Sequence, residues 1–148
     1  MDYYHAHKKE MLDEGILYVR LSLRYLSHTK LKIFIRKVSR VLSFPFLYRW
    51  AYSDTLMNNV EDDIIYSVPV LSSVTVSQLK SLIDAAIEKK KVCVLMFHSI
   101  VEDGNSHDNW DYEKGKFEDL CKYLFALQEK GKLEVVTSLK AYQLLKEG

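Results

Sequence analysis

The hydrophobic pattern is clearest in the second half of the chain, where helical and strand-like segments alternate. Apolar residues recur at helical spacing from Val76 to Ile87, which predicts an amphipathic helix. Thr75 and Gln78 have the spacing of a capping box, which satisfies two backbone amides at the start of that helix. Residues 92–97 are apolar without interruption, as expected for a strand that is covered on both faces.

The alternation continues to the end of the chain. Residues 99–111 are polar and predict a loop, and the apolar positions from Phe117 to Leu127 predict a helix that ends at Gly131. Residues 133–137 predict a short strand, and residues 139–146 a final helix. Alternating strands and helices with short connections are typical of parallel βα units, in a doubly wound sheet or a barrel. We therefore expect one α/β domain that comprises residues 1–148.

The first half is less regular. Residues 7–14 predict a helix that ends at Gly15, followed by a strand at residues 16–20. Residues 64–71 predict another strand, in which Pro69 favours an edge strand or a strand end.

Residues 30–42 predict a helix with two unlike faces. One face is apolar and the other largely basic. We expect this helix to dock on the domain with its basic face in solvent, and the alternative is a helix that lies on an anionic membrane. The apolar positions are Leu31, Phe34, Ile35, Val38, Val41 and Leu42, and the basic ones are Lys32, Arg36, Lys37 and Arg40.

Composition and charge narrow the class of protein. The chain has 148 residues, of which 48% are hydrophobic and 28% charged, as in ordinary globular domains. A net charge of +1 argues against binding nucleic acid through bulk electrostatics. No secretory signal and no apolar run of roughly 20 residues is visible, so a membrane partner is not expected and the chain is cytoplasmic by default. Cys93 and Cys121 lie within apolar patterns and are expected to be buried thiols.

His98 is the first candidate for chemistry. It follows the apolar run, and ligands of α/β folds bind at the carboxyl ends of the strands. A histidine there can act as a general acid or base, or it can simply cap the strand. Glu102 and Asp103 could line its pocket, although acidic side chains in loops are usually solvated.

The remaining ionisable residues predict no self-sufficient site. His5 and His7 could share a metal only with a further ligand that the sequence does not supply nearby. His28 and His107 lie in polar surroundings and are expected to be solvated. Residues 61–63 are acidic and predict an exposed turn before a strand.

Residues 77–100 resemble the C-terminal region of polysaccharide deacetylases, the NodB-like carbohydrate esterases of family four. In that family a helix of the type Leu-Lys-x-x-Ile-Asp-x-Ala, here starting at Leu79, leads into a strand carrying Leu-x-x-His, here Leu95 to His98. The Trp-Asp-Tyr at Trp110, the helix starting at Lys116 and the Val-Val-Thr of residues 135–137 are similar to the closing elements of the family. Residues 10–20 also resemble a helix, glycine and strand of the family. The resemblance covers residues 72–148 well and residues 1–71 loosely.

This resemblance implies a distorted (β/α) barrel, present here in part, and the metal-dependent removal of acetyl groups from sugar polymers. His98 would be the general acid, and Leu95 and Trp110 would contact the substrate. The Thr-Phe-Asp-Asp and His-x-x-x-His motifs, which supply the base and the metal ligands, have no match in these residues. We therefore expect no metal site in this chain, although the complete family domain binds a divalent metal, usually zinc. Without a metal-activated water, we expect the chain alone to be inactive.

Two classes of function remain open. The chain could be a truncated deacetylase-type barrel whose uncovered strand edges make it associate with itself or with a missing N-terminal half, and whose substrate is a carbohydrate polymer. Alternatively, it could be a non-catalytic carbohydrate-binding or protein-interaction module on a degenerate deacetylase fold. In that case exposed aromatic rings would stack on sugars, unless they pack in the core; the candidates are Trp50, Tyr52, Trp110 and Tyr112.

Overall fold

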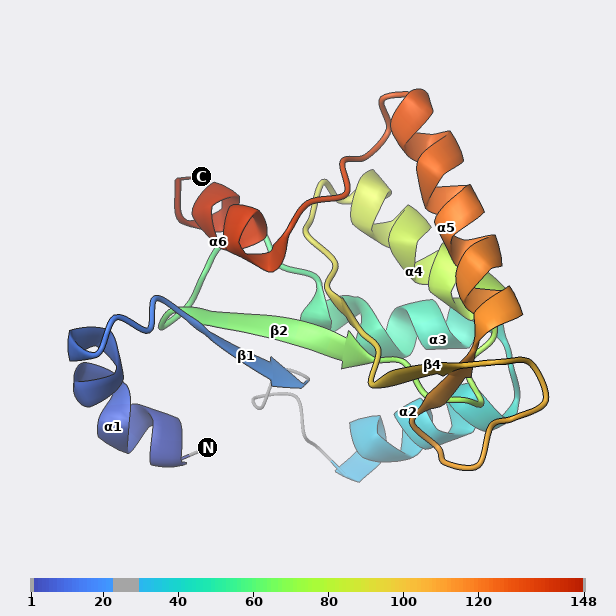
Figure 1. The fold of residues 1–148 in the computed structure, drawn as a ribbon, viewed down its shortest axis with the longest axis horizontal. Coiled ribbons are helices and arrows are strands. Elements are labelled where there is room, and N and C mark those ends of the chain that lie inside the picture. The colour runs from blue at the N-terminus through green and yellow to red at the C-terminus, as the bar shows by residue number, and fades with distance from the viewer. Residues whose placement is uncertain (1, 23–29, 148) are drawn as a thin grey trace.

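The computed structural model describes residues 2–22 and 30–147, and side chains from residue 6 onward. Helices alternate with parallel strands, which confirms the α/β class, and the strands of the described residues do not close a barrel (Figure 1). Within the described residues, no helix is long and apolar enough to cross a bilayer. The elements in chain order are α1 (Asp2–Asp13), β1 (Val19–Ser22), α2 (Lys30–Val41), α3 (Pro45–Tyr52), the 3-10 turn η2 (Ser53–Thr55), β2 (Ile64–Pro69), α4 (Val76–Glu88), β3 (Leu95–Met96), β4 (Ser99–Val101), β5 (Asp111–Glu113), α5 (Lys114–Glu129) and α6 (Ser138–Glu147).

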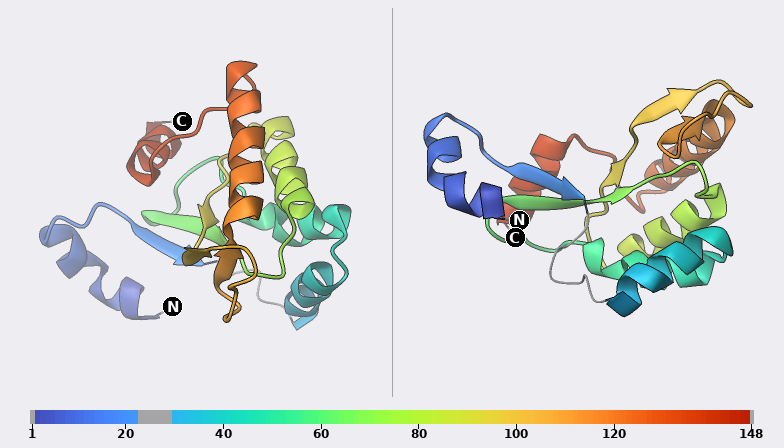
Figure 2. Two further views of the ribbon diagram at one scale, coloured as in Figure 1. Left: turned by 45° about the vertical axis from the view of Figure 1, so that its right-hand side comes forward. Right: turned by 90° about the horizontal axis from the view of Figure 1, so that it is seen from below.

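Strand β2 is the centre of the main sheet, between β1 and β3, and both pairings are parallel. Every residue of β2 is buried. Val68 belongs to a large core cluster with residues of α3, α4, β5 and α5, whereas Ile64 to Tyr66 belong to a second cluster with Tyr142 and Leu145 of α6. Helices α2, α3 and α4 form a layer on one side of the sheet (Figure 2). The two clusters explain why β2 is an uninterrupted apolar strand.

Helix α4 begins where the capping box predicts. The amide of Gln78 donates to Oγ1 of Thr75 at 3.3 Å, and the amide of Thr75 donates to Oε1 of Gln78 at 2.8 Å. Gln78 is fully buried, and Nε2 of the same side-chain amide donates to the carbonyl of Ser39 at 2.6 Å. The capping residue therefore also fastens α4 to α2.

Helix α2 forms as predicted, but its buried side combines residues of both faces: Arg36 is buried and Ile35 packs against the core, while Lys37 is exposed. Arg36 is only 3% exposed, and its Nη2 donates to both carboxylate oxygens of Asp54, each at 3.1 Å. Its Nε donates to the carbonyl of Ala51 at 3.2 Å, so the buried guanidinium has directed acceptors from the end of α3 and from η2. The expectation that the basic face lies in solvent is wrong for Arg36. The apolar side chains that consequently remain exposed include Leu31, Phe34, Val41 and Leu42.

The predicted strands at residues 92–97 and 133–137 need correction. Only Leu95 and Met96 pair with β2, and the side chains of residues 92–97 are half-buried, because β3 is an edge strand of the described sheet with one neighbour. Residues 133–137 have no strand assignment, since among the described residues no strand pairs with them. The predicted loop at residues 99–111 contains β4 and the start of β5, and β1 lies at Val19–Ser22 instead of residues 16–20.

The acidic turn at residues 61–63 joins three parts of the chain. Asp63 Oδ1 accepts hydrogen bonds from Tyr142 Oη at 2.8 Å and Lys146 Nζ at 3.0 Å, and Lys8 Nζ of α1 lies 3.3 Å from Oδ2. The hydrogen bonds from Tyr142 and Lys146 lower the pKa of Asp63. The predicted turn is confirmed, and Asp63 uses it to hold α1 and α6 beside β2.

The two thiols differ. Cys93 is half-buried against the main cluster, and desolvation raises its pKa to about 12. Cys121 is exposed on α5, so the expectation of a buried thiol is wrong there. The apolar residues that neighbour Cys121 in sequence lie on the other face of α5, where Leu120 is buried.

We predict that Asp54→Ala lowers the free energy of unfolding by about 3 kcal/mol, because it leaves the guanidinium of Arg36 buried without its carboxylate. Urea denaturation followed by circular dichroism measures this. Asp119→Ala is the matched control: it removes an exposed carboxylate paired with Lys122, and a change within about 0.5 kcal/mol is expected. Equal effects of the two substitutions would show that the buried pair does not stabilise the fold.

Candidate functional site

His98 lies just beyond the carboxyl end of β3, where the chain leaves the main sheet for β4. Its side chain is exposed, and its ring centroid lies 5.3 Å from that of Trp110, with the planes tilted by 44°. Among the described residues it forms no hydrogen bond or ion pair. The carboxyl ends of parallel strands are where α/β folds bind ligands, so the structure places His98 in a suitable position.

The neighbouring Phe97 points the other way and forms an aromatic floor below this region. Its ring packs edge-on against Tyr112, with centroids 5.3 Å apart, and against Phe117 at 5.2 Å. Tyr112 is fully buried, and desolvation raises its pKa to about 12. The floor holds the start of β4 against β5 and α5, which fixes the backbone that carries His98.

Asp111 organises the loop that brings Trp110 to His98. Its Oδ2 accepts hydrogen bonds from the amides of His107 at 2.9 Å and Asp108 at 3.0 Å, and its Oδ1 accepts one from the hydroxyl of Ser99. These bonds lower the pKa of Asp111, with the Ser99 hydroxyl as the largest cause. The loop between β4 and β5 is short for a parallel pair, and the carboxylate closes it by binding free amides.

Further hydrogen bonds attach this loop to the rest of the domain. The amide of Ser72, just after β2, donates to the carbonyl of Asn109 at 2.9 Å. Asp103 Oδ1 accepts from the amide of Gly115 at 2.8 Å, and a Cβ at Gly115 would come within 2.6 Å of the Asp103 carboxylate, so a side chain there would displace it. Glu102 pairs with Lys114 at 3.0 Å. Both acids bind the start of α5, and no hydrogen bond or ion pair joins either of them to His98.

Leu95 is placed apart from His98. It is half-buried and packs against the main core cluster, on the side of the sheet that the helices cover. Side chains three apart on an extended chain point to opposite sides, which agrees with the exposure of His98. Of the three site residues predicted from sequence, the structure therefore brings together His98 and Trp110, and it places Leu95 in the packing beneath them.

The described residues contain no group of three or more His, Cys, Asp or Glu side chains that could hold a metal ion. His7 Nδ1 lies 3.0 Å from Glu10 Oε2 within α1, whereas the side chain of His5 and the whole of His28 lie outside the described part. His107 is exposed. The side chains placed by this structure do not fit the metal that the deacetylase resemblance implies.

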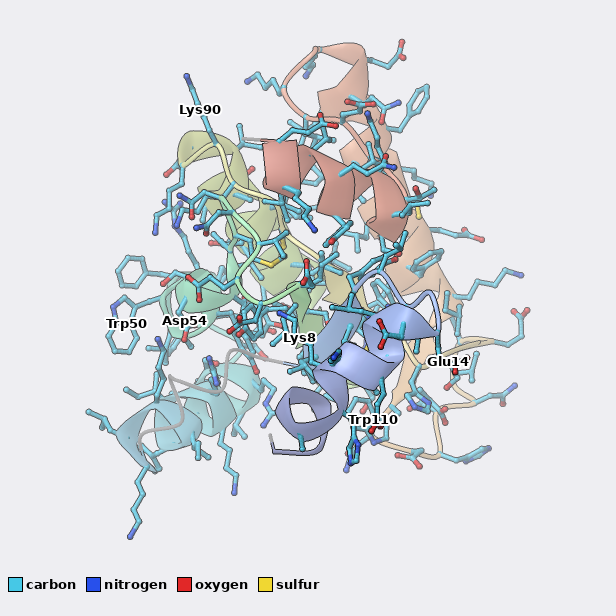
Figure 3. All side chains as sticks on the ribbon, turned by 90° about the vertical axis from the view of Figure 1, so that its left-hand side faces the viewer. Lys8, Glu14, Trp50, Asp54, Lys90 and Trp110 are labelled. Atoms are coloured by element: carbon cyan, nitrogen blue, oxygen red, sulfur yellow. The ribbon has the colours of Figure 1, made fainter. Side chains whose placement is uncertain are left out.

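The four candidate stacking aromatics divide into two pairs. Tyr52 and Tyr112 are core residues, so the packing alternative holds for them, while Trp50 and Trp110 are exposed. Trp110 points outward near the foot of the loop, and Trp50 projects from α3 on another side of the molecule (Figure 3). Only Trp110 therefore offers a ring beside the candidate histidine.

Two residues that shape the site, Ser99 and Asp111, were not singled out from the sequence. The signal available was the run of Asp and Asn at residues 108–111, since such side chains often bind nearby amides in turns. It could predict a structured turn but not that the turn closes against Ser99. Comparison of the chain with protein-family models, with curated proteins and with solved structures gave no match.

The arrangement can do two things chemically. An exposed imidazole can donate or accept a hydrogen bond and can exchange a proton with a bound molecule. An adjacent indole gives a flat apolar surface, on which a ring of similar size can rest while its polar groups reach the imidazole. Together they form a small binding surface at the sheet end.

We predict that Ser99→Ala raises the pKa of Asp111 towards the ordinary value of about 3.9, because the hydroxyl stabilises the carboxylate form. The folded pKa is lowered, so the carboxylate stabilises the loop fully above the unfolded pKa, and this is lost as the pH falls through the folded value. Carboxyl-detected NMR titration measures the pKa, and in Ser99→Ala the loop should open at a higher pH. Ser106→Ala, in the same loop, is the control and should leave the pKa unchanged; an unchanged pKa in Ser99→Ala would contradict the assignment.

Proposed function

We propose that this chain contributes the C-terminal part of a polysaccharide deacetylase-type (β/α) barrel, and that His98 is the general acid of its active site. The observation that carries the proposal is the pairing of His98 with Trp110 at the carboxyl end of a parallel sheet. The Leu-x-x-His and Trp-Asp-Tyr motifs of the sequence supply these two residues. Their proximity, across twelve positions of the chain, is what a shared substrate site requires.

The open sheet supports the same proposal. Among the described strands, β1 and β3 each have one neighbour, so each offers an unpaired edge to further strands. We propose that a polypeptide segment with its own strands, in a longer protein or on another chain, pairs there and supplies the base and the metal ligands. When that segment is missing, two copies of the chain would associate through the same strand edges.

The chain alone is proposed to be inactive for a simple energetic reason. Attack on an acetyl group at neutral pH needs a nucleophile, and bulk water with a pKa of about 15.7 is too weakly acidic to supply hydroxide. A general acid such as His98 accounts for a factor of about 10²–10⁴, whereas enzymes accelerate such reactions by at least about 10⁶. The missing factor must come from groups that these residues do not contain.

A second candidate is a non-catalytic carbohydrate-binding module, and the exposed ring of Trp110 favours it. A sugar ring stacked on the indole could donate or accept a hydrogen bond at His98 without any reaction. The two candidates share the same surface and differ in whether acetate is released once the missing segment is present.

We predict that the chain alone releases no acetate from acetylated chitooligosaccharides, with or without added Zn²⁺. An acetate assay on the purified chain, with His98→Ala as the comparison, tests this. Zinc-dependent release that is abolished in His98→Ala would contradict the proposed inactivity, while it would support the role of His98.

We predict weak sugar binding centred on Trp110. Titration of the chain with a chitooligosaccharide, followed by NMR, should give a Kd on the order of 1 mM, equal to about −4 kcal/mol. Trp110→Ala should weaken binding at least about tenfold, because the stacking surface is lost. Trp50→Ala removes the other exposed indole, which lies elsewhere, and should leave the affinity unchanged. Equal losses in both variants, or none in Trp110→Ala, would reject this surface.

A further inference from the structure

The helical layer has an exposed apolar surface that the proposed function does not use. Of the seventeen large apolar side chains exposed in the described residues, eight lie within residues 30–50, so they are concentrated in one short segment. Val41 is 80% exposed and Phe46 78%. Isolated apolar side chains are common on protein surfaces, whereas a contiguous group of them is typical of a binding surface.

This exposure is built into the fold. Arg36 and Ser39 are the buried residues of α2, held by Asp54, the carbonyl of Ala51 and Gln78. The opposite side of the helix is therefore held outward. In α3 the buried residues are Tyr48, Ala51 and Tyr52, so Phe46 and Trp50, one turn apart, are also held outward.

The outward face of α2 alternates cations with apolar side chains. Lys30, Phe34, Lys37 and Val41 follow one another at spacings of four, three and four, which places them in one stripe along the helix. All four are exposed, and among the described residues neither lysine forms an ion pair. Long lysine side chains beside apolar residues can extend to a charged surface while their neighbours enter an apolar layer.

The charge of the segment is of one sign. Residues 30–53 contain six of the 21 lysines and arginines and none of the 20 acidic residues, so the rest of the chain carries a net negative charge. In Figure 3, Trp50 stands at the margin of the molecule directly above α2, so the two helices form one outer edge of the layer. Tryptophan is enriched at the membrane–water interface, at the level of the lipid headgroups.

We propose that the exposed face of α2 and α3, with Phe34, Val41, Phe46 and Trp50 flanked by Lys30 and Lys37, docks on the surface of an anionic lipid bilayer. The apolar side chains enter the boundary between headgroups and acyl chains, and the lysines meet lipid phosphates. The helix lies on the membrane and does not span it. A second copy of the chain fits this face less well, because it would bring two surfaces of the same positive sign together, whereas an anionic bilayer carries the opposite charge.

Vesicle binding tests the proposal. In the Trp110→Phe variant, Trp50 is the only tryptophan, and its emission should shift to the blue with phosphatidylcholine vesicles that contain phosphatidylglycerol. Vesicles of phosphatidylcholine alone should bind weakly. Salt should weaken binding to the anionic vesicles, since it shortens the screening length to about 3 Å at 1 M.

Matched variants locate the surface. Phe34→Asp should weaken binding at least about tenfold, because it brings a negative charge to the acyl boundary. The double variant Lys30→Gln and Lys37→Gln should weaken it about 25-fold, at about fivefold for each charge. Phe125→Asp and Lys122→Gln change exposed positions on α5 and should leave binding unchanged. Since Phe34 and Phe125 are both exposed, equal urea midpoints of the variants will show that they are folded.

Three outcomes overturn the proposal. The first is binding that does not depend on anionic lipid, and the second is equal loss in the α2 and α5 variants. The third is a dimer without lipid that Phe34→Asp converts to monomers in sedimentation, which would assign the face to a second copy. Sugar binding at Trp110 is measured separately, so failure here leaves the proposed function untouched.

Discussion

The buried guanidinium of Arg36 is the interaction on which the arrangement of the helical layer depends. It joins α2 to Asp54 and to the carbonyl of Ala51, while Gln78 joins the same helix to the start of α4. Burying a charge is costly unless it is paired and hydrogen-bonded, so the partners must stay in place. Helices α3 and α4 cover the main core around β2, and α2 is the outermost helix of the layer. The buried guanidinium therefore fixes both α2 and the packing of the layer on the core.

The same kind of constraint acts in the loop between β4 and β5. The carboxylate of Asp111 accepts hydrogen bonds from two loop amides and thereby places Trp110 beside His98. In both places an acidic side chain accepts hydrogen bonds from several donors and holds neighbouring groups in a defined position. The difference is burial: Asp54 is largely covered, whereas Asp111 accepts its bonds at the surface and is more open to changes of pH and salt.

Local signals in the sequence predicted the elements that depend on nearby residues. The capping box of Thr75 and Gln78 and the helix after it were predicted correctly, because both partners lie within one turn. The strand at residues 133–137 was not, since apolar alternation indicates a strand only where another strand is available to pair with it. Residues 92–97 form only a two-residue strand with β2 and are half-buried, since among the described strands β3 has one neighbour and not two.

The orientation of α2 could not be predicted from the sequence, for a related reason. Periodicity shows that a helix has two unlike faces, and the usual inference buries the apolar one. Here the orientation of the helix is set by the pairing of Arg36 with the carboxylate of Asp54, eighteen residues away, which no local sequence pattern reveals. The contact of His98 with Trp110 likewise depends on how the loop closes. The resemblance could name both residues but could not place them together.

The two exposed surfaces are compatible with each other. Trp50 and Trp110 lie on different sides of the molecule, so a chain held to a bilayer through α2 and α3 would keep the end of the sheet accessible (Figure 3). The surfaces also differ in character: one is apolar and flanked by cations, and the other is a single indole next to an imidazole. A lipid surface suits the first, which offers apolar area and positive charge, and a small polar ring suits the second, which offers one stacking plane and one hydrogen-bonding group. A polymer at a membrane surface could thus meet His98 and Trp110 while α2 stays embedded in the headgroups.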